Sequence, residues 1–475
     1  MREDRRIQRE RDAEQLRRLG YAQQLLRDMG GFSNFALSFS VISVLTGAVT
    51  LYGYGLQLGG PPVMGLGWPL VSLMSLFVAA SMAQLASAYP TAGALYHWSS
   101  LFGGPGWGFF TAWFNILGQV AITAGVDYGL ALFLAPMINW PIDRAHLLVL
   151  YSLILGSHAA LNHMGVRAVA ALNWISAWYH LAGVLLVIAA LAIFASHRPP
   201  SFLFTAFTSQ PYPYAYGFLI GLLQAQWTFT GYDASAHVTE ETVNPSLRAP
   251  WGIFLSVAVS SVVGYALLAA VTLAIGDLQA AAADQNPFIY VLRTALGPAL
   301  GGALLWVVIG AMWFCGLSSI TSNSRMLFAF ARDGGIPGSR QLSRVSSAFF
   351  SPYVAVWVSA AGAWAIALWA EAYSAMVALS TLALYASYAL PIALALRARR
   401  RGLWSARGPW NLGTWSDLVN AVALGWSGVI GVLFVLPPNQ LAGYTFAGCL
   451  AVLLAYWFGW MRGRFAGPRL ALPTE

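Results

Sequence analysis

The chain has 475 residues, of which 58% are hydrophobic and only 9% are charged. Soluble domains carry about 25% charged residues, so this composition excludes an ordinary soluble protein and indicates one that crosses a membrane many times. The formal net charge of +8 does not indicate nucleic-acid binding, because the basic residues follow a membrane topology instead.

Residues 1–31 are expected to form a cytoplasmic leader. Arginines and acidic residues alternate through this segment, which makes it too polar for a cleavable signal peptide or a membrane span. Its helical part is expected to be solvated.

The rest of the chain divides into apolar stretches, each near the roughly 20 residues that a membrane helix needs. They predict twelve spans, at about 32–58, 64–89, 105–134, 146–162, 168–195, 214–240, 250–276, 299–326, 352–370, 372–396, 417–437 and 441–461. We expect a first unit of five helices at 32–195, a second at 214–396, a peripheral pair at 417–461 and a cytoplasmic tail at 462–475.

The arginines predict which side of the membrane each loop occupies. All 25 basic residues are arginine, and with the N-terminus inside the cell only Arg144, Arg198 and Arg293 fall in outer loops. Cytoplasmic loops carry the excess of positive charge, so both termini are expected to be cytoplasmic. We expect a multi-pass protein of the cell membrane, taken to be a bacterial inner membrane.

A short motif recurs in the first and sixth spans. Residues 43–49 read SVLTGAV and residues 228–234 read TFTGYDA, so each span contains Thr-Gly in its middle, at Thr46-Gly47 and Thr230-Gly231. Because five spans separate the two copies, the second copy is inverted in the membrane. Glycine-interrupted spans at matching places in inverted halves are typical of a transporter binding site.

Longer stretches resemble a known family. Residues 19–47, LGYAQQLLRDMGGFSNFALSFSVISVLTG, and residues 231–253, GYDASAHVTEETVNPSLRAPWGI, resemble signatures of the amino acid/choline transporter family. That family belongs to the amino acid–polyamine–organocation superfamily. Residues 89–104, YPTAGALYHWSSLFGG, and residues 322–337, SNSRMLFAFARDGGIP, resemble segments that the whole superfamily shares.

The resemblance implies an all-α integral membrane protein with the LeuT-like fold, a 5+5 inverted repeat with helices 1 and 6 broken, and two further helices. It also implies transport of amino acids, 4-aminobutyrate, choline or polyamines. From these observations together we expect a secondary active transporter, or permease, that moves an amino acid or a 4-aminobutyrate-like zwitterion by alternating access, coupled to protons. The alternatives are a choline or polyamine transporter, and a transporter-like nutrient receptor. No nucleophile–base pair, cofactor motif or metal-ligand spacing is present, so we expect neither an enzyme nor a cofactor or metal.

A broken helix leaves backbone groups free to bind the two ends of a zwitterion. We expect the carboxylate at Ser43, Thr46, Gly47 and Ala48, and the amine at the carbonyls of Thr228, Phe229 and Thr230, next to Gly231. The superfamily often has Gly-Ser-Gly in helix 1, where this chain has Leu45-Thr46-Gly47, which keeps a choline-like cation open. Trp227 matches an aromatic gate of the superfamily, although a tryptophan here could simply face lipid or core.

Two ionisable residues are candidates for proton coupling. Asp233 matches a position where relatives carry an acid, and a structural acid or a direct partner of the substrate amine are the other readings. His180 lies about 18 Å along its helix, near the membrane midplane, where a proton carrier or a packing histidine are both possible. Sodium is the alternative to protons, bound by hydroxyls matching a site of sodium-coupled relatives: Ser318, Ser319, Thr321 and Ser322.

Four further ionisable residues are placed by position alone. Glu240 and Glu241 are expected at the cytoplasmic interface, with a gating contact to arginines as the alternative. Asp127 lies about 33 Å along its helix and is therefore expected at the outer interface. His158 is expected in the middle of its span, without a partner that the sequence identifies. Cys315 and Cys449 are expected to be core residues.

Overall fold

The computed structural model describes residues 2–369, 373–404 and 406–468, and its regular elements there are helices, apart from one isolated bridge between Met29 and Thr242. The first half comprises α1 (Arg2–Arg18), α2 (Gly31–Ile42), α3 (Val44–Thr50), α4 (Tyr52–Gly59), α5 (Trp68–Ala88), α6 (Ala94–Gly103), α7 (Pro105–Met137), α8 (Arg144–His163) and α9 (Val166–Phe194).

The second half begins after a surface loop. It comprises α10 (Tyr214–Gly221), α11 (Leu223–Thr228), α12 (Ala234–His237), α13 (Pro245–Leu273), α14 (Leu278–Ala283), α15 (Pro287–Arg332), α16 (Ser339–Leu342), α17 (Tyr353–Trp369), α18 (Tyr373–Arg400), α19 (Ser416–Leu433) and α20 (Gln440–Tyr456). A π-helical turn, Val63–Gly67, precedes α5, and a second one, Trp457–Met461, follows α20.

Ten helical segments of the described chain are long and apolar enough to cross a membrane. They correspond to ten of the twelve predicted spans. The predicted span 214–240 is divided among α10, α11 and α12, and the predicted span 352–370 contains the 17-residue apolar helix α17. Residues 370–372, at the junction of two predicted spans, and residues 469–475 of the predicted tail lie outside the described residues.

The predicted span 299–326 is much too short. Helix α15 runs for 46 residues, from Pro287 to Arg332, with a kink at Gly297, whose φ of 77° is not helical and which Pro298 follows. Glycine adopts this conformation without strain. The kink separates a short first arm from the long apolar helix that the hydropathy detected.

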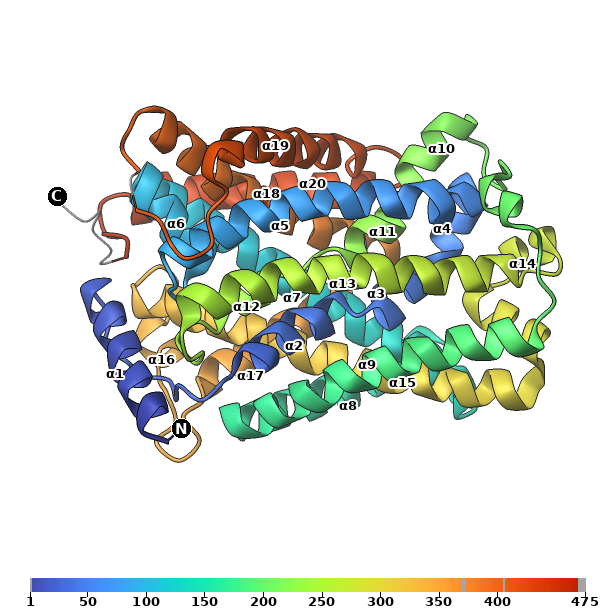
Figure 1. Cartoon of the computed structure of the whole chain (residues 1–475), viewed down its shortest axis with the longest axis horizontal. Helices are drawn as coiled ribbons and strands as arrows, with labels where there is room; N and C mark the ends of the chain where they lie inside the picture. Colours follow the sequence, from blue (N-terminus) through green and yellow to red (C-terminus); the bar gives the residue numbers. More distant parts are fainter. Residues whose placement is uncertain (1, 370–372, 405, 469–475) are drawn as a thin grey trace.

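The long helices run roughly side by side along the length of the molecule (Figure 1). Helix α7 packs along α18 and α15, and α13 packs along α5 and α2. Helix α1 lies at one end of the bundle and α10 and α14 lie at the other (Figure 1). The short helices α2, α3, α11 and α12 are therefore enclosed by long ones.

Candidate functional site

The first predicted break lies at Ser43, between α2 and α3. Ser43 has φ 34° and ψ 87°, in the left-handed region that a non-glycine residue rarely adopts. The prediction of a break at residues 45–48 is wrong by a few positions, because Thr46 and Gly47 are helical residues of α3. A strained residue persists only where its surroundings hold it, and here its side chain is held from two sides.

Two neighbours hold the Ser43 hydroxyl. It lies 2.6 Å from Thr46 Oγ1 and 2.7 Å from His180 Nε2. His180 Nδ1 lies 2.8 Å from the Ser176 carbonyl, which can only accept, so Nδ1 carries the proton and Nε2 accepts from Ser43. The structure thus brings His180 of α9 to the break between α2 and α3, which we call the helix 1 break because it lies in the first predicted span.

The second break lies where the sequence predicts it. Helix α11 ends at Thr228, Phe229 has φ −84° and ψ 56°, and Gly231 has φ 79° before α12 begins at Ala234. A side chain at Gly231 would be strained by that φ and would collide with Val41 of α2. Glycine is therefore required at this break.

Gly47 has a different role from Gly231, although both follow a threonine. A Cβ at Gly47 would lie 2.7 Å from Thr228 Oγ1 and 2.8 Å from Thr228 Cα. The glycine permits α3 and α11 to cross at close range, and it does not break its own helix. Ala48 lies in the same turn, and its carbonyl accepts a hydrogen bond from Gln224 of α11 at 3.0 Å.

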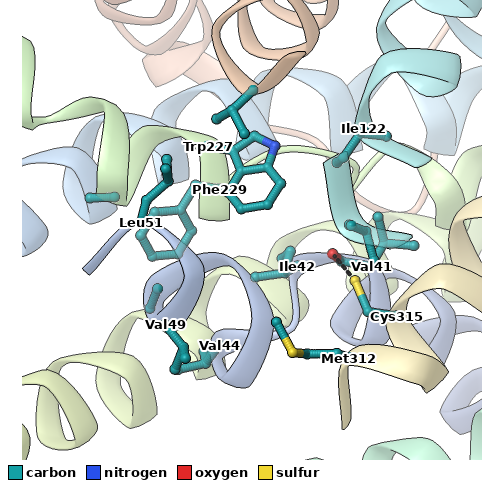
Figure 2. Packing of buried hydrophobic residues seen from close by; sticks show 14 of the residues in the cluster. Val41, Ile42, Val44, Val49, Leu51, Ile122, Trp227, Phe229, Met312 and Cys315 are labelled. Atoms are coloured by element: carbon teal, nitrogen blue, oxygen red, sulfur yellow. Dashed lines mark hydrogen bonds between the residues drawn. The ribbon is translucent and has the colours of Figure 1, made fainter. Parts of the chain in front are cut away.

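Apolar residues surround the crossing. Figure 2 shows Val41, Ile42 and Val44 beside the helix 1 break, with Trp227 and Phe229 approaching from helix 6. The two breaks thus lie within one buried cluster.

The break between α11 and α12, which we call the helix 6 break because it lies in the sixth predicted span, frees backbone groups. Two tyrosines of α18 satisfy these groups. Tyr385 donates to the Phe229 carbonyl at 3.1 Å, and the Gly231 N–H donates to the Tyr388 hydroxyl at 3.0 Å. The Thr230 hydroxyl donates to the Trp227 carbonyl at 2.5 Å. The Phe229 carbonyl, predicted to face an amine, therefore already has one donor.

Asp233 is held by four side chains. Its Oδ2 accepts from Asn115 Nδ2 at 2.8 Å and Gln119 Nε2 at 3.1 Å, and lies 3.1 Å from His237 Nε2. Tyr388 donates to Oδ1 at 2.8 Å. The carboxylate is fully buried and ties α7, α12 and α18 together beneath the break.

The four hydroxyls predicted as a sodium site do not face one point. Ser318 donates to Asn173 of α9 and Thr321 donates to Asn162 of α8, at 2.8 and 2.7 Å. Ser319 and Ser322 are buried without a hydrogen-bond partner among the described residues. Helical geometry places Ser318 and Ser322 on one face, with Ser319 and Thr321 to either side.

Cys315 also contacts the helix 1 break. Its thiol donates to the Val41 carbonyl at 3.3 Å, the contact drawn in Figure 2. In a continuous helix that carbonyl would accept from Leu45, four residues on. The break frees the carbonyl, and the thiol of α15 takes it.

A cavity of about 670 Å³ opens near the ends of α3 and α15. Thr50, Tyr54, Asn286 and Tyr373 are among its lining residues. The Tyr373 ring lies edge-on to Trp227, with centroids 6.0 Å apart, and Trp227 is 2% exposed. Trp227 and Tyr373 therefore lie between the cavity and the two breaks.

The opposite side of the breaks is sealed by buried ion pairs. Glu240 lies 2.8 Å from Arg332, and Glu241 lies 3.1 Å from Arg325. Both glutamates are fully buried within the protein, and the contact with arginines, the alternative to a purely interfacial position, is observed. Both arginines belong to the last two turns of α15.

The leader packs against the same region and is more than a solvated helix. The Asp28 and Met29 N–H groups donate to the Glu241 carbonyl at 3.0 and 2.9 Å, and Arg27 donates to the Thr242 carbonyl at 2.6 Å. Burial lowers the pKa of Arg27, and the carboxylates of Asp12 and Glu240 oppose that shift. The leader is thus part of the closure on this side.

Asp127 does not lie at an exposed interface. It is fully buried, and its Oδ2 lies 3.1 Å from Nδ1 of His158, which is also fully buried. The prediction failed because α7 has 33 residues and a length of about 50 Å, well beyond a core of about 30 Å. Asp127 is the twenty-third residue of α7, and neighbouring helices still bury it there.

Sequence reasoning missed Asn115, Gln119, Tyr385 and Tyr388. A weak pattern was available, because each pair stands three or four residues apart in an otherwise apolar helix and therefore shares a face. Only the fold shows that both faces meet Asp233.

Among the described residues, no group of three or more His, Cys, Asp or Glu side chains could hold a metal ion. The chemistry that the site offers is therefore hydrogen bonding, helix termini and a few ionisable side chains.

Comparisons with known proteins agree with this architecture. A family model described as amino acid permease matches residues 29–459. The amino-acid permease BAT1 of Arabidopsis thaliana is 37% identical, over 95% of this chain and 95% of the relative. Its rice homologue is 36% identical over 95% and 94%, and the GABA-specific permease of Saccharomyces cerevisiae is 27% identical over 91% and 80%.

These matches cover nearly the whole chain, including the segments between the two broken helices. They confirm the resemblance to the amino acid–polyamine–organocation superfamily. The chain therefore belongs to the amino acid permease family, whose members are multi-pass membrane transporters and not enzymes.

Proposed function

We propose that this permease is a secondary active transporter for an amino acid or a 4-aminobutyrate-like zwitterion, working by alternating access. The observation that carries the proposal is the crossing of α3 and α11 at Gly47 and Thr228, next to both breaks. The N-terminus of α3 presents a positive helix end to a carboxylate, although the Thr46 and Gly47 N–H groups already donate to the Ser43 carbonyl at 2.8 and 2.9 Å. The C-terminus of α11 offers carbonyl groups to an amine.

We propose the LeuT-like arrangement for the helices, with residues 32–195 and 214–396 as inverted repeats and 417–461 as a peripheral pair. Support comes from the two breaks, which fall in the first and sixth of twelve predicted spans. In this arrangement both termini are cytoplasmic, α1 covers the cytoplasmic end, and the cavity opens to the outside.

Proton coupling through His180 and Asp233 is the proposed energy source. His180 contacts Ser43 directly, so a proton on Nε2 would remove the acceptor of the Ser43 hydroxyl. Protonation and the geometry of the break are then linked. One elementary charge that moves through a membrane potential of 100 mV releases about 2.3 kcal/mol, and this energy can drive accumulation of the solute.

Choline or a polyamine is the second substrate class. One relative, 30% identical over 84% of this chain, is described as a putative amino acid/polyamine transporter. A polyamine needs carboxylates as partners, and the buried acid nearest the breaks, Asp233, already has four hydrogen-bonding neighbours. We therefore favour the zwitterion.

Counterflow in proteoliposomes tests the function. Vesicles loaded with unlabelled amino acids, 4-aminobutyrate, choline or putrescine receive the labelled solute outside. We expect rapid counterflow with one of the first two classes. Counterflow with choline or putrescine alone would favour the second substrate class, and binding without any counterflow would indicate a nutrient receptor.

A further inference from the structure

One buried ionisable pair has no role in the cycle proposed above. Asp127 and His158 are joined through Oδ2 and Nδ1 at 3.1 Å, and both side chains are fully buried. The remaining polar atoms, Asp127 Oδ1 and His158 Nε2, have no hydrogen-bond partner among the described residues. Buried polar groups are normally paired, so these two open positions require an explanation.

The unpaired nitrogen, His158 Nε2, is an atom at which the pair can bind a proton. When the imidazole is neutral, Nδ1–H donates to the carboxylate and the pair carries one negative charge. A proton added at Nε2 makes the ring an imidazolium and brings the net charge to zero. Proton binding at Nε2 therefore changes the net charge of the pair by one unit.

The surroundings contain few competing groups. Tyr151 of α8 and Cys315 of α15 are titratable side chains that interact electrostatically with Asp127. The Trp313 ring packs on His158 with centroids 5.2 Å apart. One carboxylate and one imidazole are too few ligands for a metal ion, whereas they suffice for a proton.

The pair is close to the helix 1 break through α15. A Cβ at Gly316 would collide with Asp127 Oδ1 and crowd the His158 ring, so α15 approaches the pair closely at this glycine. The preceding residue, Cys315, donates to the freed Val41 carbonyl. Consecutive residues of one helix thus contact the pair and the break.

We infer that Asp127 and His158 form a proton-binding site of the transport cycle, in addition to His180 and Asp233. The inference rests on the proposed function. The site takes up one proton at His158 Nε2 on one side of the membrane and returns it on the other, and α15 transmits the change in charge to the break.

The test compares Asp127→Asn and His158→Gln with a matched control. The control is Asp143→Asn, which alters another Asp–His pair, joined to His146 at 2.6 Å but half exposed. Each variant is reconstituted and assayed without sodium, for counterflow and for accumulation driven by an imposed pH gradient. We expect Asp127→Asn and His158→Gln to keep counterflow and to lose pH-driven accumulation. The control should keep both activities. Asp127→Glu, which restores the carboxylate, should recover accumulation.

The inference would be overturned if Asp127→Asn accumulates solute in response to a pH gradient as strongly as the control does. If Asp127→Asn does not reach the membrane, His158→Gln, which retains a donor to the carboxylate, decides by the same two assays. If the parent protein exchanges solute but accumulates it only with sodium, the assignment of protons as the coupling ion is overturned, while the proposed transport function stands. A parent protein without counterflow for any of the solutes overturns the proposed function and the inference together.

Discussion

Ser43 combines a strained backbone conformation with a side chain that contacts a buried histidine, His180. Its φ of 34° is unfavourable for serine, and its hydroxyl bridges Thr46 and His180. A strained residue that several contacts hold is a frequent feature of functional sites. The serine, more than the nearby Thr-Gly pair, therefore defines the helix 1 break.

His180→Ala should uncouple uptake from a pH gradient while solute exchange persists. The variant removes the acceptor of the Ser43 hydroxyl and the titratable group, and exchange requires only reorientation of the loaded carrier. The measurement is pH-driven uptake beside counterflow, without sodium. Phe39→Leu, a change in a side chain that packs on the same ring, is the control for packing.

If His180→Ala retains full pH-driven accumulation, His180 is not a coupling residue. If the parent protein requires sodium, the hydroxyls of α15 become the better candidates, beginning with Ser319 and Ser322, for which the described part of the chain provides no hydrogen-bond partner.

Gly231→Leu should abolish transport while the protein still inserts. The side chain would be forced into a positive φ and against Val41, which costs about 1–2 kcal/mol for the backbone alone and more for the collision. Gly156→Leu is the matched control, because a Cβ at Gly156 meets no atom within 4 Å. Uptake by Gly231→Leu at the level of Gly156→Leu would show that this conformation is dispensable.

At the scale of elements, the site depends on two short helices, α3 and α11, that cross at close range. Gly47 of α3 lies directly on the backbone of Thr228 in α11. Neither helix is long enough to be stable alone in water, since isolated helices shorter than about 12 residues are marginal. Their position is therefore set by the long helices that enclose them.

Gly47→Ala should reduce transport about tenfold or more and lower the melting temperature. The new methyl would lie less than 3 Å from Thr228 Cα, a backbone atom that cannot rotate away, and overpacking of this kind costs about 1–3 kcal/mol. Uptake and thermal unfolding in detergent measure the effect. Gly302→Ala, which meets nothing within 4 Å, should match the parent protein. An unimpaired Gly47→Ala protein would show that the crossing is not tight.

At the scale of the whole molecule, one end is sealed and the other is hollow. Buried pairs Glu241–Arg325 and Glu240–Arg332, together with the leader, close the end that carries α1. The cavity of about 670 Å³ lies at the other end, above Tyr373 and Trp227. In the proposed alternating-access cycle, this cavity is assigned to the outer side, and Trp227 and Tyr373 are assigned to the outer closure.

Arg325→Gln should shift the protein toward the state that is open at the α1 end. Removing one partner of a buried pair costs about 3–5 kcal/mol, and this cost falls on the closed state alone. A cysteine at Ser374, which lines the outer cavity, should then react more slowly with an impermeant thiol reagent, in a Cys449→Ser background.

Arg17→Gln, which alters an exposed pair with Glu14, is the control. Faster labelling, or no change, in Arg325→Gln would contradict the assignment of this pair to the inner closure. Glu241→Gln combined with Arg325→Gln should restore part of the parent labelling rate, because neither charge is then left unpaired.

The sequence by itself determined the class of protein, the course of the chain and the second break. Ten spans agree with hydropathy because lipid requires each helix to be apolar and to satisfy its own backbone. Gly231 could be identified because only glycine tolerates its φ, a local property.

Only the tertiary structure decided which residues meet. Asp127 with His158, Ser43 with His180, Tyr388 with Asp233 and Glu241 with Arg325 are each separated by at least 31 residues. Their side chains make these contacts because long helices tilt and bend past one another. Counting residues along a single helix, as for Asp127, cannot include that geometry. Position along the chain sets which helix carries a charge, and packing sets whether the charge is exposed, paired or buried.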